Sequence, residues 1–373
     1  MYIKWNLTKK CSLNCRFCHN ALKRKEWEKD LDFHDIHKAV KNLNESNNVM
    51  GITLLGGEPT EAENFFEVCN ALKNTDIKFG FITSGEHICE NKFEEIIFNQ
   101  NLKFIGISID SLCNEKVEYI RGRDILDLQL NGLDKILRIK EENGLKFDIF
   151  INTILMKPNI NDIQDIIQYF YNKNVKKVQI LGYNRSDAKS KELALSVEEE
   201  YEIVERLADF ISKNIEEWKK NDFKLRLNFL PPIAADYINK KYNLDIFDNT
   251  SFSCPIYRDT VFISNDGHVY PCDSYKPYII TDDDNNPIKV YEIDNINKKS
   301  FNEIIKNEFF LELKGLMKKK DIIYKSCSPC NECSQFLKTC YPCIKLAMYE
   351  GDVEFEKCHY YKNKIYEEKL INE

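Results

Sequence analysis

Fourteen cysteines are the residues of this chain with the most distinctive chemistry, and they are unevenly spread. Three lie close together at Cys11, Cys15 and Cys18, and eight lie from Cys254 to Cys358. The other three are scattered: Cys69, Cys89 and Cys113. The chain opens without an apolar run of signal-peptide length, so we expect a cytoplasmic protein with reduced cysteines. Clustered thiols in such a compartment indicate metal ligands rather than disulfides.

The first three cysteines have the spacing C-x3-C-x2-C. Thiolates so close in one loop suit an iron–sulfur cube. A cube has four irons and no fourth cysteine lies nearby, so one iron would be open to another ligand. An open metal position is typical of a catalytic site, whereas structural sites are closed. The alternatives are a zinc site completed by His19 and a set of ordinary buried cysteines.

The eight C-terminal cysteines are the number that two 4Fe–4S cubes need for full ligation. They lie in three groups, the first of which spans Gly267: Cys254 and Cys272; Cys327, Cys330, Cys333, Cys340 and Cys343; and Cys358. Two C-x2-C units could instead form a Zn(Cys)4 site. The six residues between the two units are few for a zinc ribbon, and four cysteines would remain unexplained. We therefore expect iron–sulfur clusters here.

Short apolar runs alternate with amphipathic stretches in the first half of the chain, and these elements must position the first cysteines. The runs are rich in β-branched residues and almost continuously apolar, as in parallel strands buried on both faces. Six strand–helix repeats predict an α/β fold, either a partial barrel or an open doubly wound sheet. The expected strands are Ile3–Leu7, Ile52–Leu55, Lys78–Thr83, Phe104–Asp110, Phe147–Leu155 and Val178–Tyr183. The expected helices are Phe33–Leu43, Glu61–Leu72, Lys92–Phe98, Leu128–Ile139 and Ile160–Tyr171.

The strand–helix rhythm ends near residue 190. A long helical stretch over Val197–Asn221 is followed by a possible strand over Lys224–Leu230. We expect a barrel domain over 1–195, a bridging region over 196–250, and a small α+β domain over 251–373. The net charge of -7, with basic residues interleaved among acidic ones, argues against nucleic-acid binding. No run of eighteen apolar residues occurs, so we expect no transmembrane helix.

The cysteine triad directly after the first strand, with Phe17 before its last cysteine, resembles the radical S-adenosylmethionine (SAM) superfamily. The residues Gly56, Gly57, Glu58 and Pro59 follow the second strand and resemble the family's Gly-Gly-Glu-Pro motif, which holds the methionyl amino group of SAM. Glycines let backbone approach a ligand closely, and a carboxylate complements an ammonium group. The resemblance implies a partial (β/α)6 TIM-like barrel, with SAM on the open iron.

Further SAM contacts are implied at the ends of the later strands, which is the face where barrel enzymes place their sites. The resemblance assigns Ser84 after the third strand, and Ser108 and Asp110 after the fourth. It also assigns Arg121, Asn152 on the fifth strand and Leu181 on the sixth.

The C-terminal cysteines resemble the SPASM extension of radical SAM enzymes, which holds two auxiliary 4Fe–4S clusters. The resemblance implies one set of ligands for the nearer cluster and one for the outer cluster: Cys254, Cys272 and Cys343; and Cys330, Cys333, Cys340 and Cys358. The inner spacings are six and two residues rather than the family's five and three, and Cys327 is surplus. Cys327 is therefore either the fourth ligand of the nearer cluster or free. With the first cluster, three 4Fe–4S clusters are implied.

Enzymes with this extension mostly modify ribosomally made peptides. The resemblance therefore implies a peptide maturase that forms a 5′-deoxyadenosyl radical and crosslinks, epimerises or oxidises a residue. A reductant such as flavodoxin or ferredoxin would deliver the electron. Only ten residues precede Cys11, so we expect the barrel mouth or a separate leader-binding protein to capture the leader of a peptide substrate.

Asp273, directly after Cys272, motivates a second hypothesis. Anaerobic sulfatase maturases oxidise a protein Cys or Ser to formylglycine and carry an Asp at the matching position as proton acceptor. A carboxylate that caps the cluster loop explains Asp273 equally well. Those maturases also have another cysteine shortly before the one that matches Cys254, and this chain has none. A third hypothesis, a non-enzymatic Fe–S electron carrier, leaves Gly56–Pro59 and the open iron without a purpose.

Overall fold

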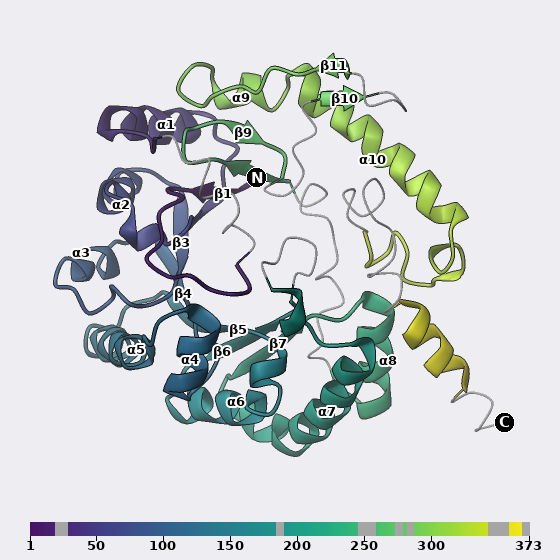
Figure 1. The fold of residues 1–373 in the computed structure, drawn as a ribbon. Coiled ribbons are helices and arrows are strands. Elements are labelled where there is room, and N and C mark those ends of the chain that lie inside the picture. Colours follow the sequence, from purple (N-terminus) through teal and green to yellow (C-terminus); the bar gives the residue numbers. More distant parts are fainter. Residues whose placement is uncertain are drawn as a thin grey trace.

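The computed structural model describes residues 1–18, 29–183, 190–244, 259–272, 279–281, 287–341 and 358–367. Its centre is a curved sheet in the order β7-β6-β5-β4-β3-β2-β1-β8-β9 (Figure 1). The strands of this sheet are β1 Tyr2–Asn6, β2 Gly51–Leu55, β3 Lys78–Thr83, β4 Leu102–Ser108, β5 Asp148–Ile154, β6 Lys177–Leu181, β7 Lys224–Asn228, β8 Thr260–Ile263 and β9 Val269–Tyr270. Strands β1 to β8 run parallel, and β9 returns antiparallel to β8.

Helices α1 to α7 lie on the outer side of the curved sheet (Figure 1). Their bounds, with those of the later helices, are α1 Phe33–Glu45, α2 Phe65–Lys73, α3 Phe93–Ile97, α4 Asn114–Arg121, α5 Leu126–Glu142, α6 Ile163–Asn172, α7 Val197–Lys220, α8 Pro232–Tyr242, α9 Phe301–Ile304 and α10 Glu308–Ser326. This is the strand–helix alternation of a partial TIM-like barrel. The predicted fold class is therefore confirmed, and each of the six predicted strands agrees with the structure to within two residues at either end.

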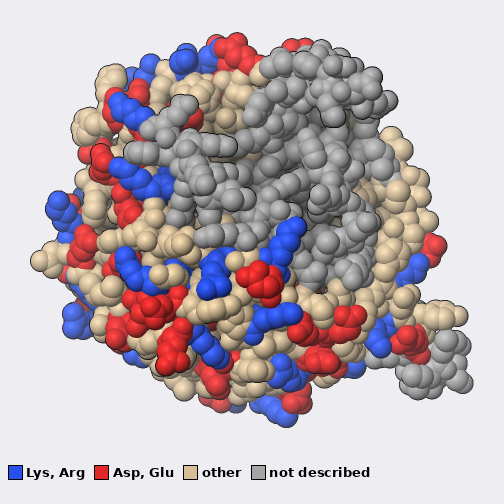
Figure 2. Space-filling view, viewed as in Figure 1, with Lys and Arg blue, Asp and Glu red and all other residues tan. Residues whose placement is uncertain are grey.

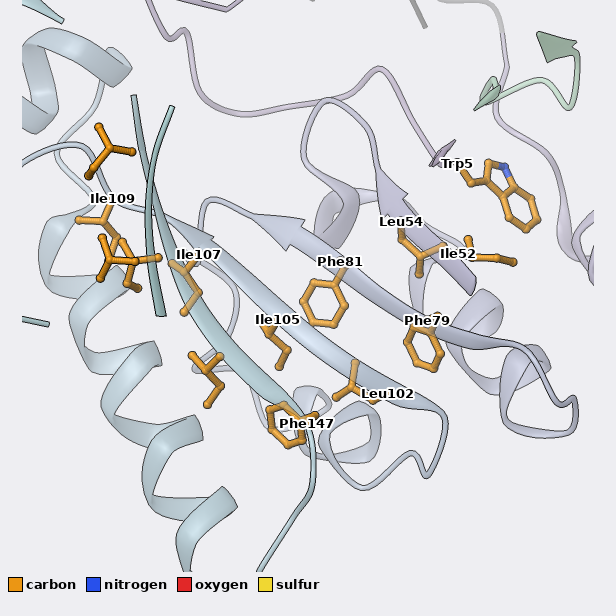
Figure 3. Packing of buried hydrophobic residues seen from close by; sticks show 14 of the residues in the cluster. Trp5, Ile52, Leu54, Phe79, Phe81, Leu102, Ile105, Ile107, Ile109 and Phe147 are labelled. Atoms are coloured by element: carbon orange, nitrogen blue, oxygen red, sulfur yellow. The ribbon is translucent and has the colours of Figure 1, made fainter. Parts of the chain in front are cut away.

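The core lies between the strands and the helices outside them. Figure 3 shows Phe79 and Phe81 of β3 beside Ile105 and Ile107 of β4 on one face of the sheet. Successive side chains of a strand point to opposite faces, so residues two apart share a face. The ring centroids of Phe65, Phe81 and Phe93 lie 5.3 to 6.4 Å apart, and these contacts join α2 and α3 to β3. The β-branched and aromatic strand composition therefore serves this packing.

The inner face of the sheet depends on two strand glycines. A Cβ at Gly80 would lie 2.5 Å from the ring of Phe104, and a Cβ at Gly106 would lie 2.6 Å from the ring of Phe150. The two rings lie 5.6 Å apart. Glycine at these positions therefore lets large side chains fill the narrow inside of the curved sheet.

The structure adds elements that the sequence did not predict. Helices α4 and α8 were not expected, because α4 buries only a few side chains and α8 has no strong helical spacing. Strand β8 pairs with β1, so Ile3 lies opposite Val261 although the two residues are far apart in the chain. Strands β7, β8 and β9 thus continue the sheet beyond the first 195 residues.

The last part of the described chain carries α10, a two-stranded ladder of β10 (Ile279–Thr281) with β11 (Pro287–Val290), and helical residues 358–367. The described surface seen in Figure 2 mixes Lys and Arg with Asp and Glu around its lower edge. Among the described residues, no helix has the length and apolar character needed to cross a membrane.

Candidate functional site

A cavity of about 380 Å³ lies at the carboxyl ends of β2 to β6. It brings together residues that are widely separated in the sequence but were predicted to act at one site. Twelve of them line it: Cys11, Cys15, Cys18, Gly56, Gly57, Glu58, Ser84, Ser108, Asp110, Arg121, Asn152 and Leu181. Pro59 is not part of the lining, and it begins a short 3-10 helix, Pro59–Glu61.

The cysteine loop of residues 11–18 is held in place by main-chain hydrogen bonds to the end of α4. Asn14 N donates to Arg121 O at 3.1 Å, and Arg16 N donates to Ile120 O at 2.9 Å. Gly122, which ends α4 with a φ of +80°, lies against the same loop, because a Cβ there would be 3.1 Å from Asn14 O. The helix that the sequence did not reveal therefore positions the three cysteines.

The three thiols can be ligands of one iron–sulfur cube. Among the described residues, no group of three His, Cys, Asp or Glu side chains is placed to hold one metal ion. In a 4Fe–4S cube each thiolate binds a different iron, so the sulfurs need not converge on one point. Burial lowers the pKa of the nearby Arg121, but Asp110 and Cys15 more than offset this and raise it. Arg121 is therefore a fixed positive charge beside a thiol that must ionise to bind metal.

The two glycines after β2 allow a close backbone contact within the chain itself. Gly57 N donates to Thr8 O at 2.7 Å, and Glu58 N donates to Lys10 O at 2.8 Å. A Cβ at Gly57 would lie only 2.1 Å from Lys10 O, directly before Cys11. The motif in the sequence predicts that this glycine pair allows close approach of a ligand. In the structure the pair also lets the backbone of residues 8–10, just before the cysteine loop, pack against the end of β2.

Glu58 is buried, and its carboxylate ties the ends of β2 and β3 together. Its Oε1 accepts hydrogen bonds from the amide and hydroxyl of Thr60 and from Thr83 Oγ1. Its Oε2 accepts one, from Ser84 N at 2.7 Å. Each carboxylate oxygen can accept about two hydrogen bonds, so Oε2 keeps capacity for a donor in the cavity. The carboxylate can therefore serve both the strand ends and an ammonium group of a ligand.

Asp110 and Arg121 form a buried ion pair at one side of the cavity, with 2.6 Å between Oδ2 and the guanidinium. Asp110 Oδ1 also accepts from Ile154 N at 2.9 Å. The pair thereby joins the ends of β4 and β5 to α4. Arg121 Nε is buried and has no hydrogen-bond partner among the described residues. The Nε–H group is thus a buried donor that a ligand could satisfy.

The remaining predicted residues lie on the strand ends as expected. Asn152 on β5 accepts a hydrogen bond from Gln179 at 3.1 Å, and Leu181 ends β6. Tyr183 follows Leu181 in the cavity lining and was not predicted; its phenol donates to Ser190 O, and burial raises its pKa to about 12. The hydroxyl of Ser84 is buried with no described partner. A cavity lined by thiols and unpartnered polar groups fits a cluster and a polar organic cofactor.

Three of the C-terminal cysteines lie in one turn after α10. Cys327 caps α10, Asn331 N donates to Cys327 O at 2.9 Å, and Cys333 N donates to Cys330 O at 3.2 Å. Burial raises the pKa of the Cys330 thiol to about 11, and the neighbouring Cys333 and Cys327 add to this shift. The structure therefore places the surplus Cys327 beside the C-x2-C pair.

The segment that carries Cys358 is tied to the same turn. Lys362, one helical turn after Cys358, pairs with Glu332 at 2.6 Å. The chain makes a further turn before Cys340, because Cys340 N donates to Gln335 O at 3.0 Å. Cys254, Cys343 and Asp273 lie outside the described residues, as does His19. The division of ligands between the two auxiliary clusters therefore stays a prediction.

Gly267, the glycine of the first C-terminal spacing, turns the β8–β9 hairpin. Its φ of +86° disfavours other residues, and a Cβ there would lie 3.0 Å from Asn295. The hairpin also contacts the barrel, because Asn265 donates to Asp30 at 2.9 Å and Leu31 N donates to Asn265 O at 3.0 Å. Gly267 thus allows the tight turn of a hairpin that contacts residues 30 and 31.

Two families match the chain in sequence. The Radical SAM superfamily matches residues 5–170, and the SPASM family, an iron-sulfur cluster-binding domain, matches residues 254–334. A GTP 3′,8-cyclase of Campylobacter fetus is 24% identical over 283 residues, which cover 74% of this chain and 80% of that protein. A Pyrococcus abyssi protein named "Probable GTP 3′,8-cyclase" is 25% identical over 168 residues. The matched residues make up 45% of this chain and 52% of the Pyrococcus abyssi protein, so the chain spans about half the length of that relative.

Solved structures share the fold. Streptococcus suis SuiB bound to S-adenosylmethionine has a TM-score of 0.68 at 16% identity, covering 94% of this chain and 74% of SuiB. The protein anSMEcpe with bound AdoMet has a TM-score of 0.67 at 17% identity, covering 100% of this chain and 94% of anSMEcpe. At these identities the likeness concerns the fold alone.

Proposed function

Because the chain combines a radical SAM domain with a SPASM domain, we propose that it is a cytoplasmic enzyme that modifies a residue of a ribosomally made peptide. The modification is a crosslink, an epimerisation or an oxidation. The enzyme would carry three 4Fe–4S clusters and receive its electron from a flavodoxin-like or ferredoxin-like reductant. Its chain would consist of a barrel domain over 1–195, a bridging region over 196–250 and a cluster-binding domain over 251–373.

The observation that carries the proposal is the single cavity that holds the cysteine loop and five strand ends. Cys11, Cys15 and Cys18 would hold the catalytic cluster, and SAM would lie between it and the strand ends. When bound, the cluster and SAM supply a 5′-deoxyadenosyl radical that removes a hydrogen atom from the substrate. The protein's own part is to hold these groups at a fixed distance and exclude water.

The chain's residues have distinct binding tasks in this cavity. Glu58 offers the spare capacity of Oε2 to the methionyl ammonium, since that oxygen accepts only one described hydrogen bond. Arg121 offers its unpartnered Nε to a carboxylate or ribose oxygen while Asp110 holds its other end. The hydroxyl of Ser84 offers a third contact. Each of these groups is fixed by the fold before a ligand arrives, which reduces the cost of binding.

Two observations favour a peptide over a nucleotide as substrate. The chain carries a SPASM match and eight cysteines in its C-terminal region. The fold likeness to SuiB and anSMEcpe covers almost the whole chain, and SuiB has also been solved bound to precursor peptide SuiA. The sequence likeness to GTP 3′,8-cyclases is the competing observation, so GTP is the alternative substrate to be tested.

The test uses anaerobically reconstituted protein with SAM and a chemical reductant. We expect 5′-deoxyadenosine to form, and a peptide encoded beside this gene to gain a mass change that depends on SAM. A product from GTP, with no change in any such peptide, would contradict the peptide proposal. The absence of 5′-deoxyadenosine from protein with a full iron content would contradict the radical SAM assignment.

The second candidate is oxidation of a protein Cys or Ser to formylglycine. It is favoured by the fold likeness to anSMEcpe and by Asp273 as a proton acceptor. Asp273→Asn keeps the shape of the side chain but removes the base, so the rate of formylglycine formation should fall by about a hundredfold to ten-thousandfold. Release of 5′-deoxyadenosine without substrate should persist. A normal rate with intact clusters would leave Asp273 without a catalytic role.

A further inference from the structure

Gln129 is a buried polar side chain that belongs to none of the sequence motifs. It lies in the first turn of α5 and is 0% exposed. Its side-chain nitrogen donates to the backbone oxygen of Ser84 at 2.5 Å and to that of Ser108 at 2.8 Å. Both serines line the cavity, at the ends of β3 and β4, whereas Gln129 itself does not. One amide therefore links two adjacent strand ends from outside the sheet.

The orientation of this amide is determined by its partners. An amide group has two donors on nitrogen and an acceptor oxygen, and both donors are used here. If the group were turned over, its oxygen would face two carbonyl oxygens. The oxygen of Gln129 is buried and has no hydrogen-bond partner among the described residues. An unpartnered buried acceptor destabilises the fold, and the two hydrogen bonds that the nitrogen donates must offset this cost.

The backbone of Ser84 is held from two sides. Its N donates to Glu58 Oε2 at 2.7 Å, and its O accepts from Gln129. Only the hydroxyl of Ser84 has no described partner, although it is buried at the cavity. The backbone bonds thus fix where this hydroxyl lies, and the hydroxyl itself is left for a ligand.

Gly132 lets α5 come close enough for these bonds. A Cβ at Gly132 would lie 3.0 Å from Ile88 Cβ and 3.1 Å from Gly85 O. Gly85 has a φ of +91°, and a Cβ there would lie 2.8 Å from Ile107. Helix α5 therefore packs closely against the turn after β3. This packing places the amide of Gln129 within hydrogen-bonding distance of the carbonyls of Ser84 and Ser108.

We propose that Gln129 is a positioning residue for SAM. Its amide fixes the distance between the ends of β3 and β4, so that Ser84 and Ser108 can both contact SAM at the same time. The inference rests on the SAM site proposed above. It adds a residue that acts through the two serines without touching SAM.

The test measures the affinity of anaerobically reconstituted full-length protein for SAM. Gln129→Met keeps the length of the side chain and removes both donors, so we expect an affinity loss of about tenfold, in line with one misplaced hydrogen bond. Ser84→Ala should lose a similar factor. In the double variant the loss should be well below the product of the two, because the displaced hydroxyl no longer contributes in Gln129→Met.

Two controls separate this effect from a general loss of structure. Iron content and the spectrum of the reduced cluster should be unchanged in Gln129→Met, since the hydrogen bonds of Gln129 do not reach the cysteine loop. Gln164→Met is the matched control: Gln164 also donates to a backbone oxygen, that of Arg206, but on the outer helices. Its SAM affinity should equal that of the wild type.

An unchanged SAM affinity in Gln129→Met, or a double-variant loss equal to the product, would overturn the proposal. If Gln129→Met does not fold with its full iron content, Gln129→Asn serves instead. It keeps a neutral amide but shortens the side chain by one methylene, so it cannot bond both carbonyls as Gln129 does; the same loss is expected and an unchanged affinity is decisive. Wild-type protein that holds its clusters yet fails to bind SAM would overturn the proposed function, and this inference with it.

Discussion

The guanidinium of Arg121 and the carboxylate of Asp110 form an ion pair that is almost completely shielded from solvent, with side-chain exposures of 4% and 1%. The same Arg121 accepts a main-chain hydrogen bond from Asn14 in the cysteine loop. One residue therefore connects a strand end, a helix end and the loop that would carry the catalytic cluster. A buried pair of this kind is stable only while both partners are present.

Arg121→Met should therefore be strongly destabilising. It leaves the Asp110 carboxylate buried without its cation, which typically costs about 3–5 kcal/mol. Urea unfolding of the variant and wild type under identical anaerobic conditions measures the difference. The control is Lys213→Met, which removes an exposed pair with Asp209 and should cost less than about 1 kcal/mol. Equal stabilities of Arg121→Met and wild type would mean that the pair contributes nothing to the fold.

Gly57→Ala should disturb the catalytic cluster as well as SAM binding. The new methyl group would meet Lys10 O at 2.1 Å, so the backbone just before Cys11 must move. We expect loss of about four irons with the auxiliary clusters retained. Gly315→Ala in α10 is the control, since nothing lies within 4 Å of its Cβ position, and it should keep full iron content. Full iron content with lost SAM affinity in Gly57→Ala would instead favour a ligand contact alone.

Replacing Cys11, Cys15 and Cys18 together by Ala should remove one cluster of three. Reconstituted wild-type protein should bind about twelve irons and the variant about eight. Formation of 5′-deoxyadenosine should be abolished, because no cluster remains beside the SAM site. Iron and sulfide analysis together with absorption spectra measure this result. A native preparation rich in zinc and without iron–sulfur absorption would contradict the cluster assignment.

Cys327→Ser tests whether the surplus cysteine is a ligand. Cys327 lies in the same turn as Cys330 and Cys333, and both Cys327 and Cys333 add to the raised pKa of the Cys330 thiol. We expect the variant to lose iron or to show an altered auxiliary-cluster spectrum. Cys89→Ser is the control, because Cys89 is exposed and lies in the barrel domain. Identical spectra for Cys327→Ser and wild type would mean that Cys327 is free.

Local pattern was sufficient to predict much of the barrel. The six strands are nearly continuous apolar runs, and such runs in a βα series have few alternatives to a buried parallel sheet. The residues at the strand ends were identified by resemblance to the radical SAM superfamily, and they meet in one place because parallel strands bring their carboxyl ends to one edge of the sheet. The cavity indeed gathers twelve of the predicted site residues.

What the sequence by itself determined was therefore the kind of fold, the positions of its strands and the residues that meet at one end of them. Only the tertiary structure decided how those residues are held. The seating of Gly57 against Lys10, the clamp of α4 on the cysteine loop and the link from Gln129 to two strand ends are contacts between segments far apart in the chain. No local periodicity encodes such contacts, because hydrogen bonds of this kind depend on how helices and strands come together in space.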